Sequence, residues 1–165
     1  MTILYHPYFC EENIWQLCAD GSVPEEGRQV VFITNKLRRV AIDKQRAAGG
    51  GAAVWDYHVV LVAGGQVWDP DSTLGMPVGL ERWIRESFPP GESQFAPRFR
   101  VIDAAAYRSS FASDRSHMLD SRGRPLHPFP PWPQIGEGMN LPRLIDVESD
   151  FLGNVVDLDG LPGSL

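Results

Sequence analysis

The sequence has no long hydrophobic run, few cysteines and no excess of basic residues. No stretch of about 18 apolar residues occurs, so we expect no membrane-spanning helix. Residues 1–9 lack the basic start and apolar centre of a signal peptide. Acidic side chains outnumber basic ones by 21 to 15, which leaves a formal net charge of −6. Nucleic acid is therefore a poor candidate partner, because its phosphates bind basic surfaces.

The two cysteines, Cys10 and Cys18, are not expected to form a disulfide. If both lie on one helix, their spacing corresponds to roughly 12 Å of helical rise. A disulfide needs Cα atoms within about 7 Å of each other. We therefore expect free thiols and a reducing, cytoplasmic setting. One reactive cysteine beside one buried cysteine fits this pattern.

The remaining composition is that of an ordinary globular domain. The chain has 165 residues, of which 43% are hydrophobic and 22% are charged, and these proportions are close to average usage. The length suits one domain with its own core. We expect residues 1–165 to form a single catalytic domain with a frayed tail from about Asp157, where glycine and proline are present.

Hydrophobic periodicity and capping residues predict an α+β fold. Helices are expected over residues 11–19, 80–88, 104–111 and from about 140. Strands are expected over residues 30–33, 40–42, 54–62, 66–69 and 99–102. Gly64 and Gly65 indicate a two-residue hairpin turn between two of these strands. The order predicts a helix first, followed by a mostly antiparallel sheet.

Cys10 is a candidate nucleophile because it stands where the first helix should begin. Unpaired N–H groups and partial positive charge at a helix start favour a thiolate and can stabilise an oxyanion. Glu11 and Glu12 would repel a thiolate if they pointed inward. We expect them to point to solvent or to a cationic group of the substrate. A buried structural thiol is the alternative, and position alone favours it.

His58 is a candidate general base within the predicted strand 54–62. Strand alternation places Asp56 and Val60 on its face, and Trp55 and Tyr57 on the opposite face. A strand holds a side chain rigidly, which suits a catalytic base. A histidine satisfied within the core is the commoner alternative.

The predicted hairpin brings two carboxylates to the face of His58. Asp71 falls directly opposite His58, and Asp69 is a diagonal neighbour at about 7–8 Å between Cα atoms. A carboxylate beside an imidazole fixes its tautomer and stabilises the imidazolium. Proximity favours Asp71, whereas Pro70 should end the strand and turn the chain away, which favours Asp69. One of the two aspartates can also serve only to stabilise the turn at Pro70.

Several strings resemble the protein N-terminal glutamine amidohydrolase family. They are CEENIW at residues 10–15, WDYHVVL at 55–61, WDPD at 68–71, FASDRSHM at 111–118 and MNL at 139–141. The similarity extends from about Tyr8 to Leu144. The resemblance implies a papain- or transglutaminase-like α+β fold. It also implies a catalytic triad of Cys10 as nucleophile, His58 as base and Asp69 as orienting carboxylate.

The activity implied by the resemblance is hydrolysis of the side-chain amide of an N-terminal glutamine, giving glutamate and ammonia through a cysteine thioester. The implied substrates are peptides and proteins with a free N-terminal glutamine, and the product would enter N-terminal-residue-dependent degradation. No metal or organic cofactor is implied, and we expect a monomer. The substrate α-amino group needs an anionic partner, for which Glu11, Glu12, Asp56 and Asp114 are candidates.

Two further segments leave alternatives open. Arg115 could hold a loop by bidentate bonding to a carboxylate, and no ligand spacing suggests a metal site at His117. Residues 125–133 contain five prolines around Phe129 and Trp132. They form either a rigid wall of the cleft, which their place within the region of resemblance favours, or a polyproline ligand. The rival functions are a peptidase or acyltransferase of the same architecture and a non-catalytic binding module.

Overall fold

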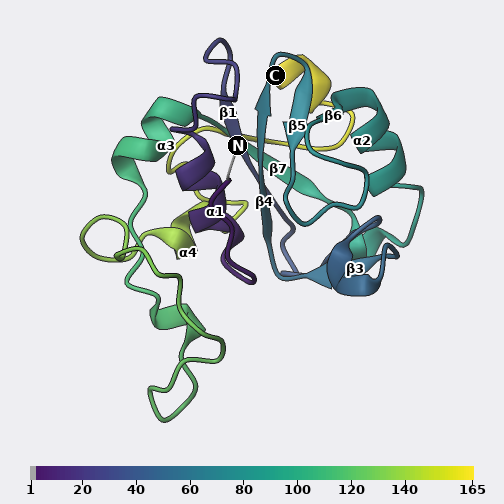
Figure 1. The fold of residues 1–165 in the computed structure, drawn as a ribbon. Helices are drawn as coiled ribbons and strands as arrows, with labels where there is room; N and C mark the ends of the chain where they lie inside the picture. Colours follow the sequence, from purple (N-terminus) through teal and green to yellow (C-terminus); the bar gives the residue numbers. More distant parts are fainter. Residues whose placement is uncertain (1–2) are drawn as a thin grey trace.

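The computed structural model describes residues 3–165 and has an α+β architecture built on a six-stranded sheet (Figure 1). The strands are β1 (Gln29–Thr34), β4 (His58–Ala63), β5 (Gln66–Trp68), β6 (Val78–Gly79), β7 (Arg98–Asp103) and β8 (Asn154–Val156). Their order is β6-β5-β4-β1-β7-β8, and every neighbouring pair is antiparallel. A separate two-stranded sheet pairs β2 (Val40–Ile42) with β3 (Ala53–Trp55). The predicted class, α+β with a mostly antiparallel sheet, is confirmed.

The sheet is covered on both faces, because its central strands are apolar on both sides. Alternate residues of β4 enter different cores: Val59 and Leu61 one, Val60 and Val62 the other. The first core is closed by α1 (Cys10–Leu17), α3 (Ala104–Ser110) and α4 (Leu141–Leu144), and the second by α2 (Leu80–Ser87). Figure 1 shows α1, α3 and α4 on one side of the sheet and α2 on the other. Helix α1 packs directly against β4, so that the first helix meets the predicted histidine strand.

The helix signals of the sequence correspond to observed helices. The Asp103 carboxylate accepts the Ala106 N–H at 3.0 Å and caps α3. Pro142 lies in the first turn of α4, where its missing N–H leaves no hydrogen bond unmade. Short 3₁₀ turns occupy Arg46–Ala48, Ser93–Phe95, Ser116–Met118 and Pro162–Ser164.

The hairpin between β4 and β5 has the predicted turn and register. Gly64 and Gly65 both have positive φ, 57° and 71°, as a two-residue turn with matched twist requires. Ala63 pairs with Gln66, and the pairing ends where Leu61 meets Trp68. The ladder therefore stops before Asp69.

The predicted continuous strand over residues 54–62 is wrong, because the chain bends at Asp56 and Tyr57. The Asp56 carboxylate accepts the Tyr57 N–H at 3.0 Å, and the Asp56 backbone carbonyl accepts the Thr34 hydroxyl at 2.6 Å. These local bonds replace ladder bonds. The alternation of side chains between the two faces of the sheet therefore restarts at His58. The Trp55 ring stacks on the His58 ring, with 5.8 Å between the ring centroids, rather than lying on the opposite face.

The predicted frayed tail from Asp157 is also wrong. Leu161 is fully buried, and Leu158 and Leu165 pack against the same core as Trp83 of α2. The three leucines cover the second face of the sheet. Burial of apolar surface of this kind outweighs the loop-like composition of the segment.

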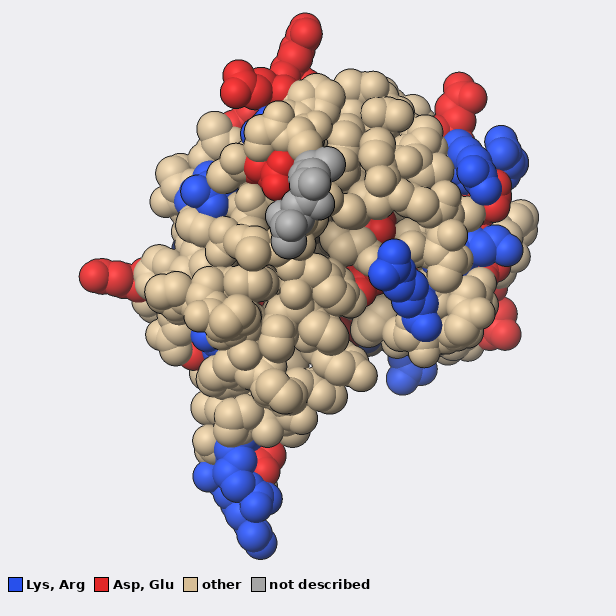
Figure 2. Space-filling view, in the orientation of Figure 1, with Lys and Arg blue, Asp and Glu red and all other residues tan. Residues whose placement is uncertain are grey.

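A long segment, residues 112–140, extends away from the body of the molecule (green in Figure 1). Figure 2 shows Lys and Arg gathered at its tip, where Arg122 and Arg124 are exposed, and both signs of charge scattered elsewhere on that face. Within residues 3–165, no helix has both the length and the apolar character needed to cross a membrane.

Candidate active site

Cys10 and His58 line one cavity of approximately 430 Å³, together with Asp71. The cavity lies where the start of α1 meets the start of β4. The other lining residues are mostly aromatic or apolar, with a few polar side chains: Tyr8, Arg38, Trp55, Asp56, Tyr57, His117, Met118, Leu126, His127, Met139, Leu141, Pro142 and Ile145. The structure thus places the predicted nucleophile and the predicted base, far apart in the sequence, in one cavity.

Cys10 is the first residue of α1 and is half-buried. The helix start is held by the Phe9 carbonyl, which accepts the N–H groups of Glu12 at 3.1 Å and Asn13 at 2.9 Å. The Asn13 side chain in turn bonds both backbone groups of His6, at 2.8 Å and 2.9 Å. The entry to the helix is therefore fixed on both sides of Cys10. Both cysteines are free thiols, as expected.

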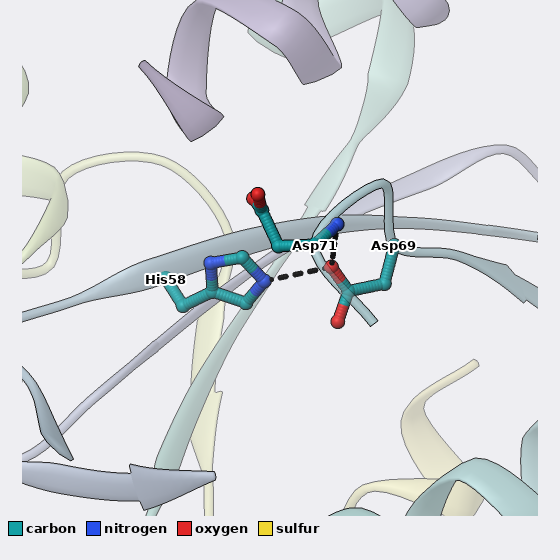
Figure 3. A group of neighbouring side chains, drawn as sticks. All are labelled: His58, Asp69 and Asp71. Carbon is teal, nitrogen blue, oxygen red and sulfur yellow. Dashed lines mark hydrogen bonds and ion pairs between the residues drawn. The ribbon is translucent and has the colours of Figure 1, made fainter. Parts of the chain in front are cut away.

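His58 and Asp69 form a buried hydrogen-bonded pair. His58 Nε2 lies 2.9 Å from Asp69 Oδ1, and both side chains are almost wholly excluded from solvent. Figure 3 shows the second ring nitrogen, Nδ1, turned away from Asp69. Nδ1 makes no hydrogen bond to any residue in 3–165, so it is the nitrogen available to a reacting group in the cavity.

Two residues that sequence reasoning did not single out hold this pair in place. Gln45 Nε2 donates to Asp69 Oδ2 at 3.4 Å, and Trp55 Nε1 donates to Gln45 Oε1 at 3.3 Å. The Trp55 ring also stacks on the imidazole, with 16° between the planes. Gln45 lies outside every predicted element, and no sequence signal marked it.

Asp69 rather than Asp71 faces Nε2, in the arrangement expected if Pro70 turns the chain. The Asp71 N–H donates to Asp69 Oδ1 at 3.1 Å, and the Ser72 N–H donates to the Asp69 carbonyl at 3.1 Å. The turn that Pro70 imposes therefore adds a hydrogen bond that orients the Asp69 carboxylate. The side chain of Asp71 is turned away from Asp69 (Figure 3).

The electrostatics of the cavity favour an imidazolium and disfavour an isolated thiolate. Burial lowers the pKa of His58, but the Asp69 carboxylate outweighs this, so the pKa lies above its usual value. Burial raises the pKa of Asp69, but interaction with His58 outweighs it, so that pKa is lowered. Burial raises the pKa of the Cys10 thiol well above its usual range, and the charges of Glu11 and Asp71 raise it further. The Cys10 thiol therefore keeps its proton unless a neighbouring base removes it, and His58 lines the same cavity.

Glu12 does not point to solvent, which corrects the expectation for this residue. It is fully buried and accepts two bonds from Arg115, at 2.9 Å and 2.8 Å, and one from Trp132 Nε1 at 2.7 Å. A buried carboxylate needs such partners because water no longer solvates it. The bidentate role suggested for Arg115 is confirmed, and Glu12 is buried away from the cavity lining, where a substrate ammonium would bind.

Replacing Arg115 by glutamine is expected to destabilise the protein by about 3–5 kcal/mol, because Glu12 would remain as an uncompensated buried charge. Arg122→Gln, on the same segment but exposed, is the matched control and should change the free energy of unfolding by no more than about 0.5 kcal/mol. Denaturant unfolding of both variants measures the difference. Equal stabilities would show that the Glu12–Arg115 pair does not hold the segment to α1.

Glu11 is likewise buried rather than exposed, and this too corrects the prediction. Its carboxylate accepts the Tyr57 hydroxyl at 3.0 Å, lies 3.2 Å from His117 Nε2, and lies 3.6 Å from Cys10 Sγ. Tyr57 and His117 line the cavity, and Glu11 is not among its lining residues. His117 is therefore a bracing residue of the site rather than a surface histidine.

The other two acidic candidates differ in position. Asp56 is exposed and lines the cavity. Asp114 is exposed, accepts the Ser116 N–H at 2.9 Å, and is not among the lining residues. Of the four predicted substrate-binding carboxylates, the structure places only Asp56 at the cavity surface.

The proline-containing segment packs behind the nucleophile. Phe129 meets Phe9 edge to face at 6.0 Å between centroids, and the Pro128 carbonyl lies 2.6 Å from His6 Nε2. Only Leu126 and His127, at its beginning, line the cavity. The wall interpretation thus describes the first residues of the segment, and the rest braces the start of α1.

His58, Asp69 and Asp71 are also the group in residues 3–165 whose ligand atoms, all within 4.8 Å of one another, could hold a metal ion. In this group Asp69 Oδ1 already accepts from His58 Nε2, whereas His58 Nδ1 has no such bond. The expectation of no metal stays a prediction.

Comparison with known proteins gives consistent matches. A family model described as N-terminal glutamine amidase matches residues 5–164. The protein N-terminal glutamine amidohydrolase of Homo sapiens is 40% identical over 161 residues, covering 88% of this chain and 78% of the relative. Proteins of the same name from Oryza sativa subsp. indica and Caenorhabditis elegans are each 34% identical, covering 94% of this chain and 76% and 91% of the relatives.

Proposed function

Since this chain belongs to the N-terminal glutamine amidase family, we propose that it is a cysteine-dependent hydrolase that converts an N-terminal glutamine to glutamate with release of ammonia. The observation that carries the mechanism is that His58 lines the same cavity as Cys10 and lies 2.9 Å from the buried Asp69. The substrates are peptides and proteins with a free N-terminal glutamine. The whole chain acts as one catalytic domain.

In the first half of the reaction, Cys10 Sγ attacks the side-chain carboxamide carbon, and His58 Nδ1 takes the thiol proton. Asp69 holds the opposite nitrogen and stabilises the imidazolium that forms. The Cys10 N–H at the start of α1 is a candidate donor to the oxyanion, since it has no partner within the helix. The tetrahedral intermediate collapses to a thioester as His58 returns the proton to the departing ammonia.

In the second half, His58 takes a proton from water, whose oxygen attacks the thioester carbon. Collapse of this intermediate gives the glutamate carboxyl group, and the proton returns to Cys10. Each step moves one proton through His58, whose raised pKa suits a group that must carry a positive charge between steps. No cofactor is needed for this sequence of steps.

The arrangement supports a papain- or transglutaminase-like organisation. A nucleophile at the first residue of a helix packs on an antiparallel sheet that carries the histidine. A peptidase or acyltransferase of this organisation would share the three residues and differ in substrate. The family membership of the chain favours the amidohydrolase.

Substrate comparison tests this function. We expect ammonia release from a Gln-initiated peptide, a rate lower by about 10²-fold or more for the Asn-initiated peptide, whose carbonyl is one methylene short of the thiol, and none from internal or acetylated glutamine. The physical reason is that a site binding both the α-ammonium and the carboxamide fixes the distance between them. Comparable rates on the acetylated peptide would instead support an acyltransferase or peptidase.

A further inference from the structure

The α-ammonium of the proposed substrate needs an anion that is both at the cavity surface and free to accept a new hydrogen bond. Glu11 and Glu12 are excluded because both are 0% exposed and already bonded to protein donors. Asp69 is excluded because it is fully buried against His58. The carboxylates among the lining residues are Asp56 and Asp71.

The carboxylate of Asp71 is held in place by the protein and can still bind a ligand. Its Oδ1 accepts the Tyr5 hydroxyl at 2.7 Å, which fixes the carboxylate. No Lys or Arg side chain within residues 3–165 forms an ion pair with it. Its position is set by the turn after Pro70, in which its own N–H is bonded to Asp69. One carboxylate oxygen thus has a protein donor, and the other is left for a ligand.

The position of Asp71 also suits the size of glutamine. Four bonds separate the reacting carboxamide carbon from the α-nitrogen, a span of about 5 Å when extended. The carboxylate of Asp71 lies within 4.8 Å of the ligand atom of His58, the group that must reach the Cys10 proton. An ammonium bound to Asp71 therefore places the carboxamide of the same residue close to His58, the proposed base for Cys10.

On these observations, and on the premise of the proposed function, we propose that Asp71 binds the substrate α-ammonium, with Tyr5 as the residue that positions its carboxylate. Asp71 thereby sets the requirement for a free N-terminus, and its place beside His58 in the cavity of Cys10 selects glutamine by length. The ligand class is a primary ammonium four bonds from an amide carbon.

Asp71 is favoured over Asp56 by burial. Asp56 is exposed, and its carboxylate already accepts the Tyr57 N–H. Water and salt weaken an ion pair at such a site. Asp71 is half-buried, so that an ion pair there is screened less and discriminates more strongly between a charged and an uncharged N-terminus.

The contact between Asp71 and the substrate ammonium would also activate the Cys10 thiol. The negative charge of Asp71 is one of the groups that hold the pKa of Cys10 high. A cation bound to Asp71 offsets that charge and makes the thiolate easier to form. Reactivity would therefore rise when a substrate with a free amino group occupies the cavity.

The test compares two peptides that differ only at the α-nitrogen. One begins with glutamine, and the other begins with a 4-carbamoylbutanoyl group, which is glutamine without its amino group. For the wild-type protein we expect kcat/KM to be roughly 100-fold higher on the first peptide, the scale of a desolvated ion pair. In Asp71→Asn this preference should fall toward one, mainly through a higher KM on the Gln-initiated peptide.

Three further variants separate this role from others. Asp56→Asn removes the competing carboxylate, and Asp114→Asn makes the same charge change outside the cavity and should leave the preference unchanged. Tyr5→Phe keeps Asp71 but removes its orienting bond, and should reduce the preference by about 10-fold. Because Tyr5 is 41% exposed, this variant tests the site even if Asp71→Asn folds poorly.

The outcomes are distinguishable. If Asp71→Asn slows both peptides equally, Asp71 acts through His58 and the inference is wrong. If Asp56→Asn alone removes the preference, the anchor is Asp56. If the wild-type protein shows no preference, the free amine is not recognised by an ion pair. If the wild-type protein releases no ammonia from the Gln-initiated peptide, the proposed function itself fails, and the inference fails with it.

Discussion

Replacement of Cys10 by alanine is expected to abolish ammonia release from a Gln-initiated peptide and to leave the fold intact. Removing a nucleophile that works together with a histidine lowers kcat by roughly 10⁶-fold in a serine protease, which sets the scale. The fold should survive because alanine is the best helix former, and Cys10 is half-buried at a helix start held by other residues. The measurements are steady-state ammonia release and denaturant unfolding on the same preparation.

Cys18→Ala is the matched control. Cys18 is buried in the core beneath α1 and does not line the cavity. Burial raises the pKa of Cys18 to about 12, so that it is not a thiolate near neutral pH. We expect about 1 kcal/mol of destabilisation, the usual scale for a single substitution, and retained activity. Undiminished activity in Cys10→Ala would overturn the mechanism, and loss of activity in Cys18→Ala alone would move the nucleophile.

Asp69→Asn is expected to lower kcat by about 10⁴-fold, the scale for a triad carboxylate changed to its amide in a serine protease. Asp69 accepts from His58 Nε2 at 2.9 Å, so that in the neutral imidazole Nδ1 is the unprotonated nitrogen that can take the Cys10 proton. An amide nitrogen facing Nε2 would favour the other tautomer, with the proton on Nδ1, and the imidazole would then face the thiol as a donor. Binding of substrate should change much less than kcat.

Asp71→Asn is the comparison, measured at saturating Gln-initiated peptide. Its kcat should fall far less than that of Asp69→Asn, because Asp71 meets the proposed substrate ammonium rather than the imidazole nitrogen. Its main effect should appear in KM. A lower kcat for Asp71→Asn than for Asp69→Asn would contradict the assignment and would make Asp71 the orienting carboxylate.

Several features of the site could be predicted from residues that are close together in the sequence. The Gly64–Gly65 turn and its register follow from the positive φ that only such a dipeptide adopts readily. The end of β5 before Asp69 follows from Pro70, which cannot continue a ladder. Each of these features depends on residues only a few positions apart, so that sequence alone carries the information.

The predictions that the structure corrects concern residues whose partners lie far away in the sequence. Glu11 and Glu12 were expected to point to solvent or to a cationic group of the substrate, because an inward carboxylate would repel a thiolate. Their partners, His117 and Arg115, come from a distant segment. Asp71 was not among the predicted substrate-binding carboxylates, and its hydrogen-bond donor Tyr5 also lies far away along the chain.

By itself, the sequence determined the α+β class, the helix that begins at Cys10, the hairpin that follows His58 and the turn that leaves Asp69 in place. Only the tertiary structure decided that α1 packs on β4, so that Cys10 and His58 share a cavity, and that residues of the segment 112–140 line part of it. Periodicity and turn chemistry act over a few residues. The packing of distant elements instead depends on apolar burial and on the pairing of buried charges summed over the whole chain, which no local pattern records.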